Sequence, residues 1–202
     1  MATAAHRTRV RQTREESRAR IVDAAARLLR ERSYAELTVD EVMREAGQGR
    51  TLFYRHFDDL ADVLARASAE AIEALYAAQR LLGSRRSAGD PDAIRGAMGL
   101  AADVYLQHGP LLRGVAEAAA GDPQLAEAHR EIRQRFDQLA ARWLADAAGR
   151  AAAPPADPAQ TARALNLMNE AYLLDAFGRE PRVTADEAAR TLTEVWLAVI
   201  RP

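Results

Sequence analysis

Apolar residues recur every three or four positions along most of this chain, with polar and charged residues between them. That spacing predicts amphipathic α-helices, and it is clearest in residues 15–31. The apolar side of this first predicted helix consists of Ile21, Val22, Ala25, Leu28 and Leu29. No segment sustains the two-residue alternation of a strand, and the helix-favouring residues alanine, leucine, glutamate and arginine dominate. The sequence therefore predicts an all-α protein.

Capping residues indicate where the later helices begin. Thr38 with Glu41, and Thr184 with Glu187, have the spacing of a capping box. Asp–Pro pairs at 90–91, 122–123 and 157–158 each offer an N-cap followed by a proline at the first helical position. Together these signals predict nine helices: 15–31, 38–46, 50–56, 59–82, 91–107, 110–120, 123–148, 158–177 and 184–200. Loops are predicted at 83–90 and 151–158, and there is no internal repeat.

The character of the chain changes near residues 60–75, where short helices with tight turns give way to long amphipathic helices. We therefore expect a small N-terminal domain at 15–60 and a larger helical body at 61–202, with the fourth helix shared between them. Residues 1–14 are expected to form a flexible basic arm. The first 20 residues carry six arginines against two glutamates, about +4, although the whole chain has a net charge of −1.

Composition narrows the class of protein further. A hydrophobic content of 49% with 28% charged residues is typical of a folded domain with a sizeable core. No run of about 18 apolar residues could span a membrane, and the N-terminal residues lack the apolar region of a secretion signal. The absence of cysteine excludes disulfides and thiolate metal sites and is consistent with the cytoplasm. We expect neither a cofactor nor a metal.

Two short predicted helices, 38–46 and 50–56, are joined by a tight turn at Gly47, which is the pattern of a helix-turn-helix. In the second of them Leu52 and Phe53 can serve the apolar side, with Phe57 closing the helix against its domain. Four polar residues then remain for an outside partner: Arg50, Thr51, Tyr54 and Arg55. Their hydroxyl and guanidinium groups suit phosphate oxygens, and arginine can also pair with guanine in the major groove.

The same residues carry a family resemblance. Residues 38–64, TVDEVMREAGQGRTLFYRHFDDLADVL, resemble the DNA-binding segment of TetR-family transcriptional regulators. The shared features are an Ala-Gly turn, an aromatic-Tyr-x-His-Phe tail and a leucine-bearing fourth helix. Residues 164–181, ALNLMNEAYLLDAFGREP, and 191–200, TLTEVWLAVI, resemble the EthR-like branch of that family.

The resemblance implies a repressor that binds a palindromic double-stranded DNA operator as a homodimer and is released by an apolar small-molecule effector. It implies these DNA-binding residues: Thr38, Gln48, Gly49, Arg50, Thr51, Tyr54, Arg55 and His56. The chain departs from the family pattern at Gln48 and Gly49, where an apolar residue and serine are common. It also has Leu52 and Leu60 where the family has a threonine and a lysine that contact phosphate. Thr51 and the arginine-rich arm are the candidates to replace those contacts.

Two amides stand on an otherwise apolar predicted helix. Asn166 and Asn169 are three positions apart and so share a face, with Glu170 beside them. Buried amides need hydrogen-bond partners, which either the helical bundle or a ligand supplies. The resemblance implies a pocket for an elongated apolar ligand, with these candidate residues: Met98, Tyr105, Phe136, Trp143, Asn166, Asn169 and Glu170. Met98, Tyr105, Phe136 and Trp143 could each belong instead to an ordinary hydrophobic core.

The resemblance also implies that the last two helices pair across a two-fold axis. Large apolar residues at helical spacing supply the candidate dimer interface: Leu165, Leu173, Leu192, Trp196 and Val199.

Two other classes of protein are alternatives. An all-helical enzyme would have to use His108, His129, Glu117 or Glu127, but no metalloprotease, nucleophile-elbow or phosphate-loop motif is present. His108 precedes Gly109-Pro110 and is explained by a favourable position at a helix C-terminus. His129 and Glu127 are two positions apart, so on a helix they do not share a face. The second alternative is a helical interaction or ligand-binding protein without DNA binding, in which the helix-turn-helix serves only as a scaffold.

Overall fold

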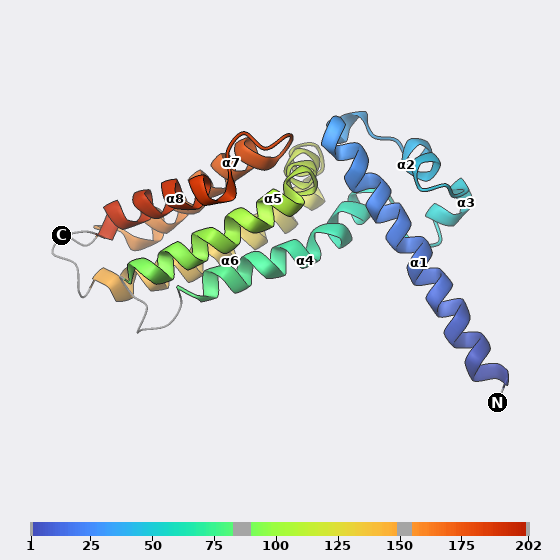
Figure 1. The fold of residues 1–202 in the computed structure, drawn as a ribbon, viewed down its shortest axis with the longest axis horizontal. Helices are drawn as coiled ribbons and strands as arrows, with labels where there is room; N and C mark the ends of the chain where they lie inside the picture. The colour runs from blue at the N-terminus through green and yellow to red at the C-terminus, as the bar shows by residue number, and fades with distance from the viewer. Residues whose placement is uncertain (1, 83–89, 149–154, 201–202) are drawn as a thin grey trace.

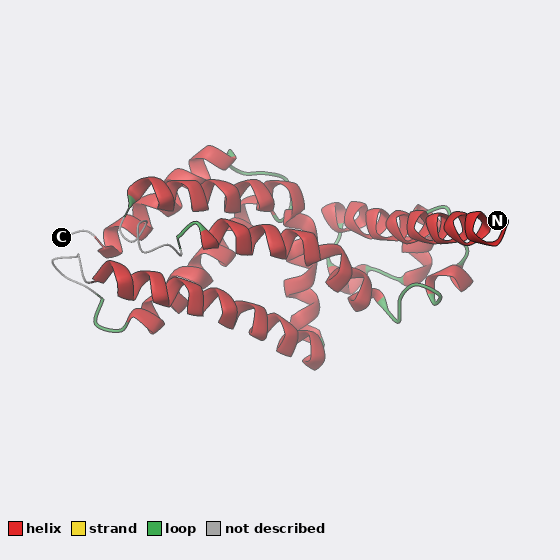
Figure 2. Ribbon diagram, turned by 90° about the horizontal axis from the view of Figure 1, so that it is seen from below, coloured by secondary structure: helices red, strands yellow, loops and turns green. Residues whose placement is uncertain are grey.

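The computed structural model describes residues 2–82, 90–148 and 155–200, and every regular element in these ranges is a helix (Figure 2). The prediction of an all-α fold is confirmed. The predicted loop at 83–90, apart from its last residue, and the first half of the one at 151–158 lie outside the described residues. The elements are α1 (Ala2–Glu31), a 3₁₀ turn η1 (Tyr34–Glu36), α2 (Val39–Glu45), α3 (Arg50–Phe53), α4 (Leu60–Arg80), α5 (Pro91–Gly121), α6 (Pro123–Ala148), α7 (Pro158–Phe177) and α8 (Ala185–Ile200).

Capping side chains are present where the helices begin. The side chains of Asp59, Asp90 and Asp157 each accept a hydrogen bond from a main-chain N–H of the first turn of α4, α5 and α7. Thr38 and Glu41 form the predicted capping box of α2. These local hydrogen bonds satisfy N–H groups that have no partner within the helix, and they fix the starting points of the helices.

Three predicted boundaries are wrong. α1 begins at Ala2, so the segment expected as a flexible arm continues the first helix, because residues 2–31 contain neither glycine nor proline to end it. α3 ends at Phe53 and not at residue 56, and a turn follows it. The helices predicted at 91–107 and 110–120 are one continuous helix with Pro110 inside it, so His108 does not lie at a helix end.

α5 changes direction along its length. Figure 1 shows its first part running across the view and its last part, in yellow-green, seen end-on. Pro110 explains the bend, since proline inside a helix removes a hydrogen bond and its ring clashes with the preceding turn. Gly109 allows α7 to approach at the same point: a Cβ on Gly109 would lie 2.1 Å from the carbonyl oxygen of Phe177.

The helices pack around two separate hydrophobic clusters. One cluster joins α1–α3 to the start of α4, and the other fills the bundle of α4–α8. Figure 1 shows α1–α3 at one end of an elongated molecule and α5–α8 at the other, with α4 running between them. α4 contributes Val63 and Leu64 to the first cluster and Ala71 to the second. The bent end of α5 also joins the first cluster, through Leu111 and Ala118.

Arg113 connects the two parts of the molecule beyond the bend in α5. Its guanidinium donates hydrogen bonds to the carbonyl oxygens of Leu29 (2.5 Å) and Arg32 (2.9 Å) at the end of α1, and to Gly178 (2.7 Å) just after α7. It also forms an ion pair with Glu117, whose other oxygen accepts a hydrogen bond from the main-chain N–H of Tyr34 at 2.7 Å. A single side chain thus holds the ends of α1 and α7 together.

Candidate functional site

The turn between α2 and α3 has the geometry of a helix-turn-helix. Gly47 has a φ of 66°, in the left-handed region that glycine adopts without strain. Its N–H donates to Arg44 O (3.1 Å), and the N–H of Gln48 donates to Met43 O (2.9 Å). This pair of bonds is a Schellman motif, which ends α2 and sends the chain directly into α3.

Aromatic residues anchor the short α3. Phe53 and Phe57 are buried in the N-terminal cluster, and their ring centroids are 5.7 Å apart. Leu52 is half-buried and packs against the same cluster, as the apolar side of the helix predicts. A helix of four residues has little stability of its own, so these anchors hold α3 in place.

The polar residues of α3 and the turn after it face outward. Thr51 and Arg55 are exposed, and Tyr54 has 55% of its surface exposed. Arg50 forms an ion pair with Asp40 of α2 at 2.9 Å, and its guanidinium lies over the Tyr54 ring, 5.9 Å from the centroid. The ion pair holds this guanidinium at the exposed junction of α2 and α3.

The remaining predicted DNA-binding residues differ in their surroundings. The side chain of Gln48 is engaged with α1: Ser17 Oγ donates to its Oε1 (2.8 Å), and its Nε2 donates to Ser17 O (3.3 Å). Gln48 therefore joins the turn to α1 and is not a free polar group on the surface. Gly49 is the N-cap of α3 and forms no side-chain cap, whereas Thr38 caps α2.

Arginines from α1 surround His56 and extend the basic surface beyond α3. Burial, followed by the charges of Arg14, Arg18 and Arg55, lowers the pKa of His56 below its usual value. Arg14 also donates to the main-chain oxygen of Arg55 at 3.3 Å. The sequence predicted DNA contacts for the arginines of residues 1–14 as a flexible arm, but assigned none to Arg18 in the first helix. This prediction missed that the first helix would carry Arg18, and through its extension Arg14, to the recognition helix.

A cavity of about 410 Å³ lies inside the bundle of α4–α8, in the size range of small-molecule sites. Most of its lining is apolar, with polar side chains concentrated on α6 and α7. Six of the seven predicted ligand-binding residues line it: Met98, Tyr105, Phe136, Asn166, Asn169 and Glu170.

Trp143 is the exception, because it is buried in the core and does not line the cavity. Its ring lies 5.8 Å from that of Trp196, which does line the cavity and donates from Nε1 to Asn169 Oδ1 at 3.1 Å. Gln79 of α4 also lines the cavity and was not predicted. The sequence signal that could have identified Gln79 is its position on the same side of α4 as the apolar residues Ile72 and Leu75.

Charged side chains in the cavity lining are largely paired with one another. Glu170 accepts from His129 Nε2 (3.0 Å) and Arg133 Nε (2.7 Å). Burial on its own would raise the pKa of Glu170, but these two hydrogen bonds outweigh it, so the pKa is lowered and the carboxylate stays charged. Burial also raises the pKa of Tyr105, which therefore remains a neutral hydroxyl.

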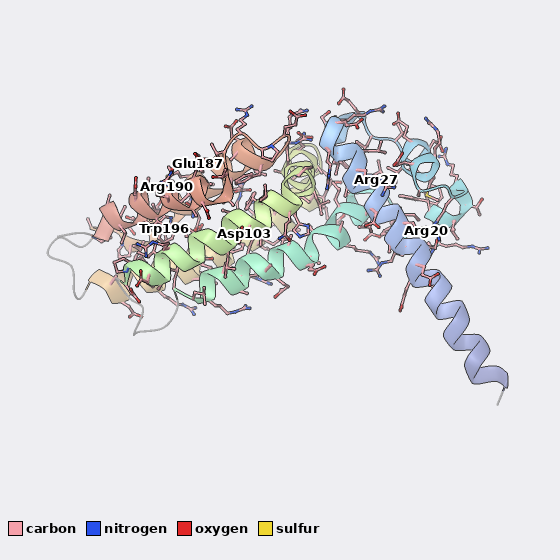
Figure 3. All side chains as sticks on the ribbon, viewed as in Figure 1. Arg20, Arg27, Asp103, Glu187, Arg190 and Trp196 are labelled. Carbon is pink, nitrogen blue, oxygen red and sulfur yellow. The ribbon has the colours of Figure 1, made fainter. Side chains whose placement is uncertain are left out.

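The predicted dimer residues are wrong in four of five positions. Leu165, Leu173, Leu192 and Trp196 are buried within their own chain, and Figure 3 shows Trp196 between α8 and α5. Val199 is half-buried and packs against the same core. The helical spacing correctly identified the apolar faces of α7 and α8, but α5 and α6 cover those faces.

The described ranges contain no cluster of three or more His, Cys, Asp or Glu residues that could hold a metal ion. Among the helices whose residues the structure describes, none is long and apolar enough to cross a membrane.

Known proteins share both halves of this architecture. Residues 21–67 match the family described as bacterial regulatory proteins, tetR family, and residues 94–201 match the family described as transcriptional regulator EthR, C-terminal domain. The HTH-type transcriptional regulator EthR of Mycolicibacterium smegmatis is 28% identical over 193 residues, which cover 95% of this chain and 89% of that protein.

Two solved structures share the fold. The TetR family transcriptional regulator PfmR from Thermus thermophilus has a TM-score of 0.73 at 22% identity, with 90% of this chain and 99% of that chain covered. NalD, the secondary repressor of the MexAB-OprM multidrug efflux pump in Pseudomonas aeruginosa, has a TM-score of 0.70 at 22% identity, with 93% and 98% covered.

A helix-turn-helix attached to a separate helical body defines a DNA-binding transcriptional regulator, and the relatives with this architecture are regulators and not enzymes. More narrowly, the chain belongs to the TetR family, and it is a regulator of the EthR type.

Proposed function

We propose that this regulator is a repressor, that it binds a palindromic operator as a homodimer in the cytoplasm, and that an apolar small molecule releases it. The observation that carries this proposal is the sharing of helices between the cavity and the DNA-binding region. α4 supplies Leu75, Ala78 and Gln79 to the cavity, and it supplies Val63 and Leu64 to the cluster that supports α3. A molecule that changes the position of α4 therefore changes the position of the recognition helix.

The DNA-binding surface in this proposal lies on α3 and the adjoining part of α1. Arg50 is assigned to a base edge, and Thr51, Tyr54 and Arg55 to phosphates, because their side chains are exposed on one short segment. Arg14, Arg18 and His56 extend the phosphate contacts, and Thr38 contributes from the start of α2. Gln48 and Gly49 position α3 and need not contact DNA directly.

The proposed dimer uses the outer faces of α7 and α8. Two large apolar side chains remain exposed there, Leu167 with 41% and Val195 with 36% of its surface. Exposed alanines flank them at helical spacing and would allow close packing: Ala164, Ala171 and Ala198. A two-fold dimer matches a palindromic site, because each recognition helix then reads one half-site.

Release follows from the spacing of the two recognition helices. Successive major grooves on one face of DNA lie about 34 Å apart, so a shift of a few ångströms at each helix prevents simultaneous docking. An effector acts only if it binds more tightly to the conformation with the wrong spacing. The repressor role is also supported by NalD, which is named as a repressor and shares the fold.

A gel-shift titration with the DNA upstream of the chain's own gene and of neighbouring genes tests this function. We expect a salt-sensitive, sequence-specific complex of two chains per site, and we expect apolar ligands that raise thermal stability to dissociate it. Ligands that stabilise the protein strongly but leave operator affinity unchanged would contradict the regulatory part. Absence of specific binding to any of these DNA segments would contradict the DNA-binding part.

A further inference from the structure

The cavity lining contains a buried acceptor, Gln79 Oε1, that no described residue completes, and it limits the chemistry of the ligand. Gln79 is 8% exposed, and its Nε2 donates to Phe136 O at 3.0 Å, but no described residue donates to its Oε1. Tyr105 is also 8% exposed and lines the cavity, where its hydroxyl can donate to a ligand. A buried polar group without a partner is costly, so Gln79 Oε1 favours a ligand that donates a hydrogen bond to it.

These two groups have opposite hydrogen-bonding needs. Gln79 Oε1 is an acceptor, and its amide cannot be turned round without removing the donor to Phe136 O. Tyr105 is a neutral hydroxyl and can donate. A ligand group that both donates and accepts, such as a hydroxyl or an amide, therefore suits the cavity better than one that only accepts.

The charges around the cavity argue against an ionised ligand. The carboxylate of Glu170 already has a partner on each oxygen, His129 and Arg133. Asp137 accepts a hydrogen bond from Asn166 at 2.8 Å and remains a second negative group. A ligand carboxylate would thus lose its hydration beside two anions. A ligand ammonium would find only a weak partner in Asp137, because this carboxylate is half-buried and already accepts from Asn166.

The other cations that line the cavity do not change this balance. Arg130 is exposed and pairs with Glu127 at 2.8 Å. Arg163 is exposed as well, so water screens its charge.

From the cavity lining we infer that the effector is a neutral, mostly aliphatic molecule whose one polar group is a hydroxyl or an amide. Gln79 selects for the O–H or N–H of this group, which donates to Gln79 Oε1. The inference rests on the proposed function in taking this cavity as the effector site. It adds that Gln79 of α4 determines which polar group the ligand carries. The polar ligand contacts expected from the sequence were all on α7.

Three ten-carbon probes test the inference in the wild-type protein: decanol, methyl octyl ketone and decanoate. Their chain lengths match. The hydroxyl of decanol donates and accepts hydrogen bonds, the ketone only accepts them, and decanoate is an anion. Calorimetric titration at neutral pH should show decanol binding about 5- to 10-fold more tightly than the ketone, and decanoate at least about tenfold more weakly than decanol. Equal affinities for decanol and the ketone, or tighter binding of decanoate, would overturn the inference, as would no detectable binding of decanol.

Two cavity variants assign the selectivity to its residues. Gln79→Met removes the acceptor and should reduce the ratio of decanol to ketone affinity to about one. Tyr105→Phe should weaken both probes by a similar factor and keep the ratio. Ser68→Ala is the matched control, because Ser68 is a buried polar residue of α4 that does not line the cavity. An unchanged ratio in a folded Gln79→Met variant would contradict the role of Gln79, and the wild-type ranking decides the ligand class even if this variant does not fold.

Gel shift with the operator separates this inference from the proposed function. If decanol and the ketone bind equally and both release the operator, the ligand chemistry is wrong while the proposed function stands. If the expected ranking is found but operator affinity does not change, the ligand chemistry is supported while regulation through this cavity is wrong.

Discussion

Arg113 Nε donates a 2.7 Å hydrogen bond to the main-chain oxygen of Gly178, although 65 positions separate the two residues. The same guanidinium donates to Arg32 O at 2.9 Å, so the end of α7 and the end of α1 share one partner. Gly178 leaves room for this contact, since a Cβ there would lie 3.1 Å from Arg113 Cδ. The DNA-binding region is therefore joined to the helical body at a second point, apart from α4.

Replacing Arg113 by methionine should destabilise the protein by about 3–5 kcal/mol. The substitution keeps an aliphatic side chain but removes the ion pair of Glu117 and the donor to three carbonyl oxygens, in a site where Arg113 is only 12% exposed. Urea denaturation measures the change. Arg95→Met is the matched control on the same helix, because Arg95 is exposed and its partner Asp92 is exposed too, and it should cost less than about 0.5 kcal/mol. Equal stability losses in the two variants would contradict the structural role of Arg113.

Arg50→Ala should weaken operator binding by about 1–3 kcal/mol and relax sequence preference, if its guanidinium reads a base. Tyr54→Phe should weaken specific and non-specific binding alike, because it removes only a phosphate partner. Gel shift with operator and with random DNA separates these effects, and circular dichroism checks the fold. Arg190→Ala, an exposed arginine of α8 seen in Figure 3, is the control and should bind as the wild type does. Unchanged affinity in both α3 variants would refute the assignment of this surface.

Arg14→Ala and Arg18→Ala should each reduce the salt dependence of DNA binding. Each arginine that neutralises a phosphate contributes about one released counterion, so the slope of log affinity against log salt should become less steep by about one per variant. Anisotropy titrations over a range of salt concentrations measure the slope. A slope identical to that of the wild type in both variants would show that α1 does not reach the phosphates.

DNA affinity should rise as the pH falls through the titration of His56. Burial and then Arg14, Arg18 and Arg55 lower the pKa of His56 in the free protein, whereas DNA phosphates would favour its charged form and raise that pKa in the complex. Binding therefore takes up a proton at acid pH, and titrations at constant salt between about pH 5.5 and 8 should show it. His56→Gln should lose this part of the pH dependence, and His108→Gln on α5 should retain it. Identical pH profiles in wild type and His56→Gln would refute the contact.

The stability of the free protein should depend on pH with the opposite sign. A folded-state pKa below the unfolded value of about 6.5 means that the unfolded chain takes up the proton first. His56 therefore reduces stability as the pH falls below that value. Thermal denaturation of His56→Gln should show a smaller loss of stability on acidification than that of the wild type.

Val195→Arg should separate the dimer into folded monomers, because Val195 lies on the outer face of α8 with 36% of its surface exposed. Trp196→Arg should instead unfold or aggregate the protein, since it buries a charge beside Trp143 without a partner. Sedimentation velocity with circular dichroism distinguishes these outcomes. A stable monomer of the unmutated protein at micromolar concentration would contradict the proposed dimer.

Asn169→Leu should reduce the affinity for effectors while leaving DNA affinity without ligand nearly unchanged. Asn169 lines the cavity, and its Oδ1 accepts from Trp196 Nε1 at 3.1 Å, so the substitution removes a polar contact at a distance from α3. Calorimetry for the ligand and gel shift for the operator provide the two readings. Loss of DNA binding in the ligand-free variant would indicate that Asn169 supports the fold and not the ligand.

Local chemistry made a large part of this protein predictable from its sequence. Apolar spacing identified the helices, and capping boxes or Asp–Pro pairs marked where α2, α5, α6, α7 and α8 begin. The glycine at position 47 predicted the turn between α2 and α3, because glycine adopts a positive φ without strain whatever its neighbours are. These signals act within a few residues, which is why one sequence was sufficient to find them.

Only the tertiary structure decided which element covers each apolar face. Periodicity predicts that Trp196 lies on an apolar side of α8, but it cannot tell whether a second chain or α5 packs against it, and the structure places it inside its own chain. In the same way Pro110 predicted a break, whereas packing of Leu111 and Ala118 into the N-terminal cluster stabilises a bend in a continuous α5. Burial, kinks and cavity linings depend on contacts between residues far apart in sequence, and the physical reason is that such contacts leave no local pattern in the chain.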